Sequence, residues 1–365
     1  MMTQPAPPDY DGRGLVNLIA ELETAVAGHS PSPGLDQDLR AFVREARAQV
    51  LVLFDGFGSH QLSHPNAADL SASHAGDIDA PFPSTTTVSL ATIATGLTPS
   101  QHGLVAYKMW MPDVGVVVNT IHMTTRWGET VPGIDYEAFL PSPNLWERLS
   151  SAGIEPIVVQ PGNFERTPLT RTLYRGARFE GYWNPDEAVA VTTDVAARGD
   201  RFVLLYVPHV DFAAHVAGQA SEAYEEAVGV ANTIWRRLVA ELPTDVGLTG
   251  TADHGHVDIE PSARLRFDDE SFPDTFVSED GRVLFIHGDP APILEVVGPS
   301  AVHLEAESLW WGPPPHHRQL EDRTPDSIIF LPPDTAVLSR HSNNRLVGYH
   351  GGVTAREREI PLLSR

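Results

Sequence analysis

The sequence of 365 residues contains no cysteine. This absence excludes disulfide bonds, thiolate metal sites and cysteine nucleophiles together, so any metal site must be built from histidine, aspartate and glutamate. The sequence also has no window approaching the roughly eighteen uncharged apolar residues that a membrane-spanning helix needs. Its first ten residues have neither a basic start nor an apolar run. We therefore expect a cytoplasmic protein without a signal peptide and without a membrane partner.

Basic residues are scarce: 25 lysines and arginines stand against 48 aspartates and glutamates, for a formal net charge of −23. A surface this acidic repels polyphosphate backbones, so we expect no nucleic-acid polymer as a partner. Hydrophobic residues make up 42% of the chain, which suffices for a large core. The length suits one α/β domain with insertions, or a large and a small domain. Nothing in the composition indicates an oligomeric state.

Apolar, β-rich runs alternate with helical patterns along most of the chain. The runs that predict buried parallel strands are residues 49–54, 155–160, 201–208, 246–251 and 283–287. The helical patterns are residues 14–27, 35–48, 142–152, 185–198 and 222–242. This alternation predicts an α/β fold, doubly wound, with a mostly parallel central sheet and helices on both faces.

The chain divides into three predicted parts. Residues 1–48 are expected to form a leader with a disordered start and helices, and residues 49–261 together with 341–365 the α/β core. Residues 262–340 contain short strand patterns and many prolines, which favours a small inserted cap or subdomain. Its aromatic and imidazole pairs, which suit either a core or a ligand pocket with the core favoured, are Trp310, Trp311, His316 and His317. A hairpin is expected within 103–120, with Leu104-Val105 and Val116–Val118 as its strands around Pro112-Asp113.

Polar side chains follow the predicted strands at the points where they end, and sites in such sheets form at the carboxyl ends of strands. The acidic and imidazole residues at these points are Asp55, Asp211, His215, Asp253, His254 and His350. Taken singly, each of these residues could be an ordinary turn residue or one of two residues that share a helix face. Together, three aspartates and three histidines are the ligands that Zn²⁺ or Mn²⁺ accepts. Two sets of three could hold two cations that clamp the attacking and leaving oxygens of a phosphoryl transfer.

A hydroxyl-rich segment, residues 83–92, enters a short predicted helix that ends at Thr95 and Gly96. A hydroxyl at a helix N-terminus lies where backbone N–H groups favour an anion, and a metal can activate a weak alcohol nucleophile. The alternative interpretation is that Ser84 or Thr85 is an ordinary helix cap.

The motifs in their order along the chain resemble the alkaline phosphatase superfamily, and most closely its type I phosphodiesterase/nucleotide pyrophosphatase branch. The matching segments are Phe82-Pro83-Ser84, Thr95-Gly96-Leu97-x-Pro99-x2-His102-Gly103, Thr251-Ala252-Asp253-His254-Gly255 and Gly348-Tyr349-His350-Gly351-Gly352. The resemblance runs from about residue 48 to the C-terminus and is weakest over 262–340. It implies an alkaline-phosphatase-like fold and a hydrolase whose catalytic residues lie in the α/β core.

The resemblance also implies roles for individual residues. One zinc would be held by Asp211, His215 and His350, and the other by Asp55, Asp253, His254 and the nucleophile hydroxyl. In the family, the nucleophile lies ten residues before the glycine of the Thr-Gly pair and sixteen before the histidine of the His-Gly pair. Counting back from Gly96 and His102 gives Thr86 both times, with Thr85 as the alternative.

The chain departs from the family pattern at one substrate-binding position. The nucleotide pyrophosphatase branch has an asparagine twenty-one residues after the nucleophile, where this sequence has Tyr107. Asn119 could replace it if the hairpin folds back. The nearby candidate cations are Lys108 and Arg126, neither of which follows a predicted strand, and Trp110 could add a stacking surface.

We therefore expect a two-metal phosphodiesterase or nucleotide pyrophosphatase that hydrolyses phosphate diesters or anhydrides through a covalent Thr86 intermediate. Its cofactors would be two divalent cations, zinc first and manganese as the alternative. Its partner would be a small phosphate-containing substrate such as a nucleotide. The alternatives are a phosphomonoesterase of the same superfamily and a non-catalytic metal-binding protein.

Overall fold

The computed structural model describes residues 5–267, 275–279, 281–339, 342 and 345–365. Its largest sheet has seven strands in the order β2–β18–β9–β1–β8–β6–β7. Their bounds are His74–Asp79, Glu359–Ser364, Val246–Thr251, Ala48–Phe54, Arg201–Val207, Glu155–Pro161 and Arg178–Tyr182, in the same order. Strand β18 runs antiparallel to both of its neighbours, and the other pairs are parallel. The predicted mostly parallel central sheet is confirmed.

The centre of this sheet consists of β1, β8 and β9. Every residue of β1 is buried, because helices cover both faces of the sheet. The register pairs Leu53 of β1 with Tyr206 on one side and with Thr251 on the other. The carboxyl ends of the three strands therefore lie side by side, which brings the segments after them together.

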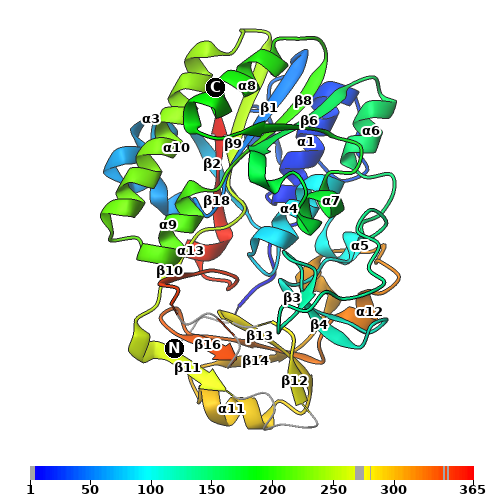
Figure 1. The fold of residues 1–365 in the computed structure, drawn as a ribbon, viewed down its shortest axis with the longest axis vertical. Coiled ribbons are helices and arrows are strands. Elements are labelled where there is room, and N and C mark those ends of the chain that lie inside the picture. Colours follow the sequence, from blue (N-terminus) through cyan, green and yellow to red (C-terminus); the bar gives the residue numbers. More distant parts are fainter. Residues whose placement is uncertain (1–4, 268–274, 280, 340–341, 343–344) are drawn as a thin grey trace.

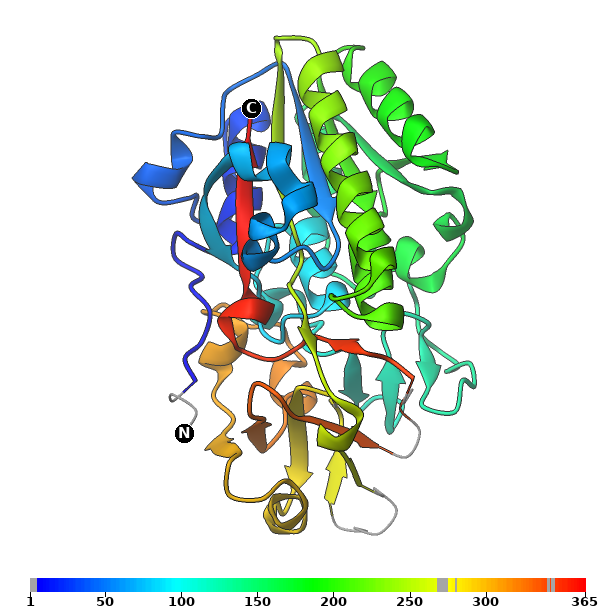
Figure 2. The same ribbon diagram turned by 90° about the vertical axis from the view of Figure 1, so that its left-hand side faces the viewer.

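Two groups of helices flank the sheet (Figures 1 and 2). One consists of α1 (Leu15–Ala27), α4 (Thr86–Thr95) and α6 (Leu145–Ser151), which contact one another. The other is built around the long α10 (Glu222–Glu241), which contacts α3 (Ala68–Ala72), α8 (Pro185–Ala196) and α9 (His209–Ala217). Within the described part of the chain, no helix is both long and apolar enough to span a bilayer.

The described residues between 264 and 339 form smaller sheets below the central one in Figure 1. A four-stranded sheet has the order β12 (Thr275–Val277), β13 (Val283–Gly288), β15 (Ser327–Phe330) and β14 (Val302–Glu305), and helix α11 (Ala291–Val297) lies between β13 and β14 in sequence. A separate pair joins β11 (Arg264–Phe267) to β16 (Ala336–Ser339). The run 283–287 is a strand as expected, but it pairs antiparallel on both sides in this second sheet. The division into core and inserted subdomain stays a prediction.

The tryptophan pair of this region is core. Trp310 and Trp311 are buried against Phe82, Phe285 and Phe330, which confirms the favoured interpretation. His316 is exposed, and the backbone N–H of His317 donates to the carbonyl of Ser100 at 2.7 Å. The core interpretation is therefore wrong for His316, and neither histidine nor either tryptophan lines the cavity described below.

Two local expectations need correction. The helix expected over 35–48 is shorter than predicted and spans only α2 (Gln37–Arg40). The residues after it contact the segment at the start of β9 instead of continuing the helix. Arg44 there donates to the carbonyl of Val246 at 2.7 Å, and Arg47 pairs with Asp245 at 2.8 Å. The hairpin is present, but its strands are β3 (Lys108–Met111) and β4 (Val116–Asn119), followed by β5 (Thr124–Thr125), so residues 104 and 105 lie outside it.

Candidate active site

Backbone hydrogen bonds join the segments that follow the three central strands. Asp55, just after β1, donates from its N–H to Val207 and accepts from the N–H of Asp211 on α9, both at 3.0 Å. The N–H of Gly56 donates to Oδ1 of Asp253, just after β9, at 2.9 Å. Three aspartates from distant parts of the sequence are therefore fixed next to one another at the carboxyl edge of the sheet.

The first cluster consists of Asp55, Asp253 and His254, whose side chains are buried. Nε2 of His254 lies 3.6 Å from Oδ1 of Asp55 and 3.4 Å from Oδ2 of Asp253. The other carboxylate oxygens are already bonded, by the hydroxyl of Tyr206 at Asp55 and by two backbone N–H groups at Asp253. Oδ1 of Asp55 and Oδ2 of Asp253 are buried without a hydrogen-bond partner among the described residues.

Two unpaired buried carboxylate oxygens facing one imidazole nitrogen are costly unless a cation compensates them. The pKa of Asp55 agrees with the need for a cation. Burial, followed by the charges of Asp211 and Asp253, raises the pKa of Asp55 well above its ordinary value. A bound cation would keep these carboxyl groups ionised together, so the residues fit a divalent metal.

The second cluster is built around Asp211. His215, one helical turn further along α9, places Nε2 3.3 Å from Oδ1 of Asp211. Asp211 forms two tight groups of potential ligands, one with His215 and His256 and one with His254 and His350. The ring of His350 stacks on that of His254, with centroids 3.6 Å apart, and lies 5.1 Å from that of His215. The six expected ligands therefore form one continuous cluster instead of two separate triads.

Three of the histidines share one orientation. Nδ1 of His215, His254 and His350 lies 2.8, 3.1 and 3.0 Å from the backbone carbonyls of Gly348, Gly255 and Ser84, respectively. A carbonyl can only accept, so each Nδ1 carries the proton and each Nε2 presents a lone pair to the cluster. This is the arrangement expected of metal-ligating imidazoles.

Two histidines of the cluster, His350 and His256, have lowered pKa values. Burial, followed by the charge of His254, lowers the pKa of His350 well below its ordinary value, and burial lowers the pKa of His256 to about 4. The neighbouring imidazoles in turn lower the pKa of Asp211, although burial alone would raise it. The neutral form of His350 is therefore favoured, and that is the form in which an imidazole binds a cation.

The hydroxyl that points at this cluster is that of Thr86, the first residue of α4. Its Oγ1 lies 3.1 Å from Nε2 of His254. The neighbouring hydroxyls have other environments: Ser84 donates to the carbonyl of Gly352, and Thr87 is buried and accepts from Thr120. Thr85 is the N-cap residue and lines the cavity beside the cluster. The residue favoured by the motif spacing is thus the one that lies next to a candidate ligand.

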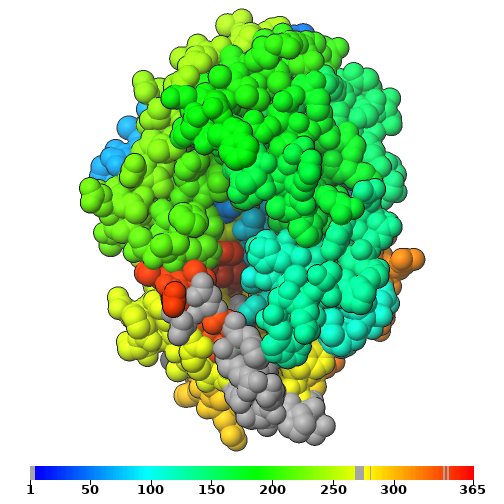
Figure 3. Space-filling view, in the orientation of Figure 1, coloured from blue at the N-terminus to red at the C-terminus, as the bar shows by residue number. Residues whose placement is uncertain are grey.

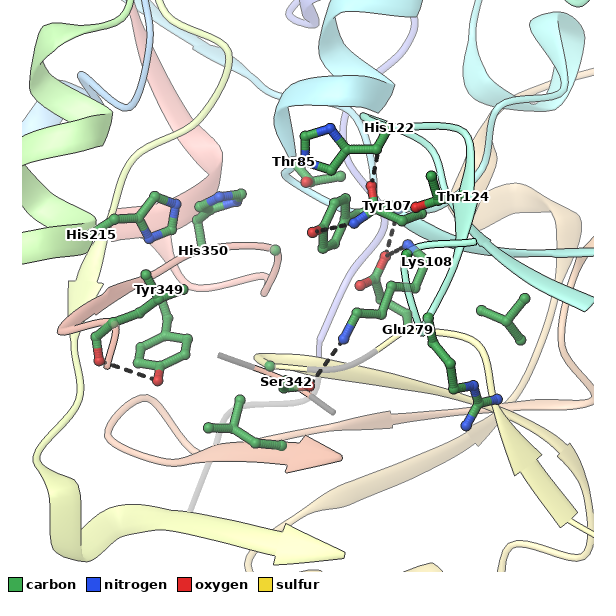
Figure 4. Close-up of a pocket in the computed structure, with 18 of the residues that line it drawn as sticks. Thr85, Tyr107, Lys108, His122, Thr124, His215, Glu279, Ser342, Tyr349 and His350 are labelled. Atoms are coloured by element: carbon green, nitrogen blue, oxygen red, sulfur yellow. Dashed lines mark hydrogen bonds between the residues drawn. The ribbon is translucent and has the colours of Figure 1, made fainter. Parts of the chain in front are cut away.

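A cavity of about 340 Å³ opens beside the cluster, in the hollow between the green and cyan surfaces of Figure 3. His215 and His350 form one wall, and the β3–β5 hairpin forms the opposite wall (Figure 4). The polar residues on this side of the cavity are Tyr107, Lys108, Asn119, His122, Thr124, Thr125 and Arg126, together with Glu279, which follows β12.

Both residues considered for substrate binding lie in this wall. Asn119 donates from Nδ2 to the hydroxyl of Tyr107 at 2.8 Å, because the hairpin register brings the end of β4 back beside the start of β3. Lys108 donates from Nζ to Ser342 at 3.0 Å. Trp110 instead packs on Phe276, with ring centroids 4.7 Å apart, and does not line the cavity.

The comparison with protein families agrees with this geometry. The model of the type I phosphodiesterase/nucleotide pyrophosphatase family matches residues 49–352. The chain belongs to this family. The resemblance to this family that the motifs indicate is thereby confirmed, and membership supports a phosphoric ester hydrolase whose clusters of aspartate and histidine could hold a metal.

Three solved structures share this fold. Murine ectonucleotide pyrophosphatase/phosphodiesterase 5 is 18% identical, with a TM-score of 0.65 over 86% of this chain and 87% of that one. An inactive variant of it in complex with AMP has a TM-score of 0.62 at 18% identity, over 86% of both chains. Phosphonoacetate hydrolase from Sinorhizobium meliloti, in complex with phosphonoacetate, is 16% identical, with a TM-score of 0.62 over 88% and 91%. No curated protein matches the sequence.

Sequence reasoning missed two residues of the site. His256 belongs to the Asp253-His254-Gly255-His256 motif, and its place two residues after a candidate ligand was the available signal. Tyr206 lies within an apolar strand and donates to Asp55, 151 positions earlier in the chain. No local pattern indicates that contact.

Proposed function

We propose that this chain is a two-metal phosphodiesterase or nucleotide pyrophosphatase that hydrolyses phosphate diesters or anhydrides through a covalent Thr86 intermediate. The observation that carries the proposal is the hydroxyl of Thr86 at 3.1 Å from His254, beside the unpaired oxygens of Asp55 and Asp253. A nucleophile beside candidate metal ligands at a helix N-terminus suits attack on an anionic phosphorus centre.

The proposed division of the ligands follows what the resemblance to the family implies. One cation would be held by Asp55, Asp253, His254 and the Thr86 hydroxyl. The other would be held by Asp211, His215 and His350. When bound, the cations would supply Lewis-acid stabilisation of the attacking and leaving oxygens and lower the pKa of the threonine hydroxyl. Zinc suits these nitrogen and oxygen ligands best, and manganese is the alternative. A cytoplasmic location stays a prediction.

The reaction has two displacements at phosphorus. Oγ1 of Thr86 bonds to phosphorus while the bond to the leaving oxygen breaks, and the leaving group departs with the electron pair and takes a proton from solvent. The hydroxyl proton passes to water. Water then attacks phosphorus and gives up a proton to solvent, the bond to Oγ1 breaks, and Oγ1 takes up a proton, which restores Thr86. The first backbone N–H groups of α4 lack intrahelical partners and are suited to bind the phosphoryl oxygens in both steps.

The opposite wall of the cavity would bind the rest of the substrate. We assign the hydroxyl of Tyr107 and the amide of Asn119 to a phosphoryl oxygen, in place of the asparagine of the family. Lys108 and Arg126 give this wall two cationic groups in a strongly acidic protein. They suit a leaving group with its own negative charge, as an anhydride provides. The same cations keep a phosphomonoesterase as the second candidate, since a monoester brings an additional charge.

Steady-state kinetics with metal-loaded protein test the proposal. The substrates are nitrophenyl thymidine monophosphate, bis-nitrophenyl phosphate, a nucleotide anhydride and nitrophenyl phosphate. We expect kcat/KM for the diesters or the anhydride to exceed that for the monoester by at least about tenfold, or about 1.4 kcal/mol of transition-state preference. Faster turnover of the monoester would move the protein to the phosphatase side of the superfamily. If none of the four substrates is hydrolysed, the alternative of a non-catalytic metal-binding protein is favoured.

A further inference from the structure

His256 is a fourth histidine of the cluster, and the family pattern gives it no role. It is fully buried. Strand β10 (Val257–Asp258), which begins at the next residue, pairs with β17 (Gly348–Tyr349) and fixes its backbone. Its ring is also confined: a Cβ added at Gly56 would lie 2.9 Å from Nε2, and one added at Gly348 would lie 3.1 Å from Nδ1. The imidazole is therefore packed closely between two glycine backbones.

The hydrogen bonding of His256 differs from that of the other three histidines. Its Nε2 lies 2.8 Å from Oδ1 of Asp211, and its Nδ1 is buried with no partner among the described residues. A carboxylate can only accept, so Nε2 carries the proton. With the proton on Nδ1 instead, a buried N–H would be unpaired and a nitrogen lone pair would face a carboxylate. Nε2 of His256 is therefore a donor and has no lone pair for a cation.

We propose that His256 is a positioning residue that fixes the carboxylate of Asp211 for the cation that Asp211 shares with His215 and His350. Oδ1 of Asp211 also lies 3.3 Å from Nε2 of His215. A carboxylate oxygen has two lone pairs, so one can accept from His256 while the other faces the nitrogen of His215. Hydrogen bonds of this kind typically change metal affinity by about 10- to 100-fold. This inference rests on the proposed two-metal function.

The effect should be confined to one cation. Asp55 is fixed by Tyr206, and Asp253 by the N–H groups of Gly56 and His254, so neither carboxylate uses His256. Loss of the His256 donor should therefore weaken the cation at Asp211 and leave the cation at Asp55 bound. A general loss of folding would weaken both.

The test is a matched pair of variants, His256→Gln and His256→Asn. The amide N–H of glutamine reaches the position of Nε2, whereas the asparagine amide is too short to reach Asp211. The full chain is loaded with Zn²⁺ and titrated with a chromophoric chelator, which gives two binding constants. We expect His256→Asn to weaken one constant by about 10- to 100-fold and His256→Gln to restore it. His287→Gln is the control, because His287 is buried on β13 and bonds to Ser278 away from the cluster.

Visible absorption of the Co²⁺-substituted protein distinguishes positioning from ligation. A positioning role predicts the same ligand-field spectrum in the unmodified protein and in His256→Gln. Equal weakening by both variants together with a changed spectrum would make His256 a ligand and overturn the inference, as would two unaltered constants in His256→Asn. An unmodified protein that binds no cation would instead overturn the proposed function itself.

Discussion

Replacement of Thr86 and of its neighbour Thr85 by alanine tests the chemical step directly. Thr86→Ala removes the only hydroxyl of Ser84–Thr87 that contacts a candidate ligand. We expect kcat/KM to fall by at least about 10⁴-fold, or about 5.4 kcal/mol. We expect a smaller loss than the roughly 10⁶-fold loss seen when a serine protease loses its nucleophile. The reason is that water could still attack phosphorus between two bound cations. Both cations should stay bound, since carboxylates and imidazoles provide the other ligands.

Thr85→Ala is the matched control. Thr85 caps α4 without a side-chain hydrogen bond to the first turn, so its loss should cost the helix little. It lines the cavity, so KM can change, but activity should stay within about tenfold, or about 1.4 kcal/mol. Thr86→Ser keeps the hydroxyl and should retain activity.

The assays are nitrophenyl release, metal content, and acid quenching with a phosphorus-labelled substrate followed by peptide mapping. The label should appear on the peptide that contains α4 in the unmodified protein and disappear in Thr86→Ala. An inactive Thr85→Ala beside an active Thr86→Ala would shift the nucleophile by one residue. Turnover without any labelled intermediate in a rapid quench would refute covalent catalysis.

Three further predictions follow from the same structure. Asp211→Ala should reduce the bound zinc from two ions per chain toward one, measured by elemental analysis. Burial lowers the pKa of His102 to about 3 and of His287 to about 4, so both resist protonation only in the folded state. Unfolding free energy in urea should therefore decrease as pH falls from about 6.5 toward 4, by about 1.4 kcal/mol per pH unit and histidine. Arg282→Met should cost about 3–5 kcal/mol, because it leaves buried Glu357 unpaired.

Each of these predictions has a result that contradicts it. One ion or none in the unmodified, metal-loaded protein would eliminate the two-site interpretation. An unfolding free energy that is flat between pH 6.5 and about 4 in the metal-free protein, and unchanged by His287→Gln, would show that these imidazoles titrate normally. A small effect of Arg282→Met beside a large effect of Glu357→Gln would show that the carboxylate is stabilised by its other donors.

The central strands could be predicted from sequence, and the edge strands could not. The runs that became β1, β6, β8 and β9 are mostly apolar, because their middle residues are buried on both faces. Strand β2 has the sequence HAGDID, β7 has RFEGY, and β18 contains Pro361. Strands β2 and β7 lie at the two edges and β18 next to one, where partners in the sheet supply the pairing. Strand formation there depends on tertiary context, which a local pattern does not contain.

The candidate ligands could be found from sequence because each follows a strand or lies in a glycine turn. Their grouping could not. Stacking of His350 on His254 joins two expected triads into one cluster, and the contact between His256 and Asp211 spans 45 positions. The tautomer of each histidine depends on which backbone carbonyl it faces, and that carbonyl belongs to another segment for His215 and His350.

His350 shows most clearly that a ligand can be recognised locally and positioned globally. The carbonyl of Ser84 orients its ring, and the hydroxyl of the same serine donates to the carbonyl of Gly352, so the chain just before the nucleophile is bonded to the loop that carries His350. The N–H of Gly352 donates to Glu357, which is paired with Arg282 just before β13. A change in the second sheet can therefore reach a candidate metal ligand through a single buried ion pair. The Arg282→Met variant should consequently weaken metal binding as well as folding, whereas the loss of an isolated surface pair would do neither.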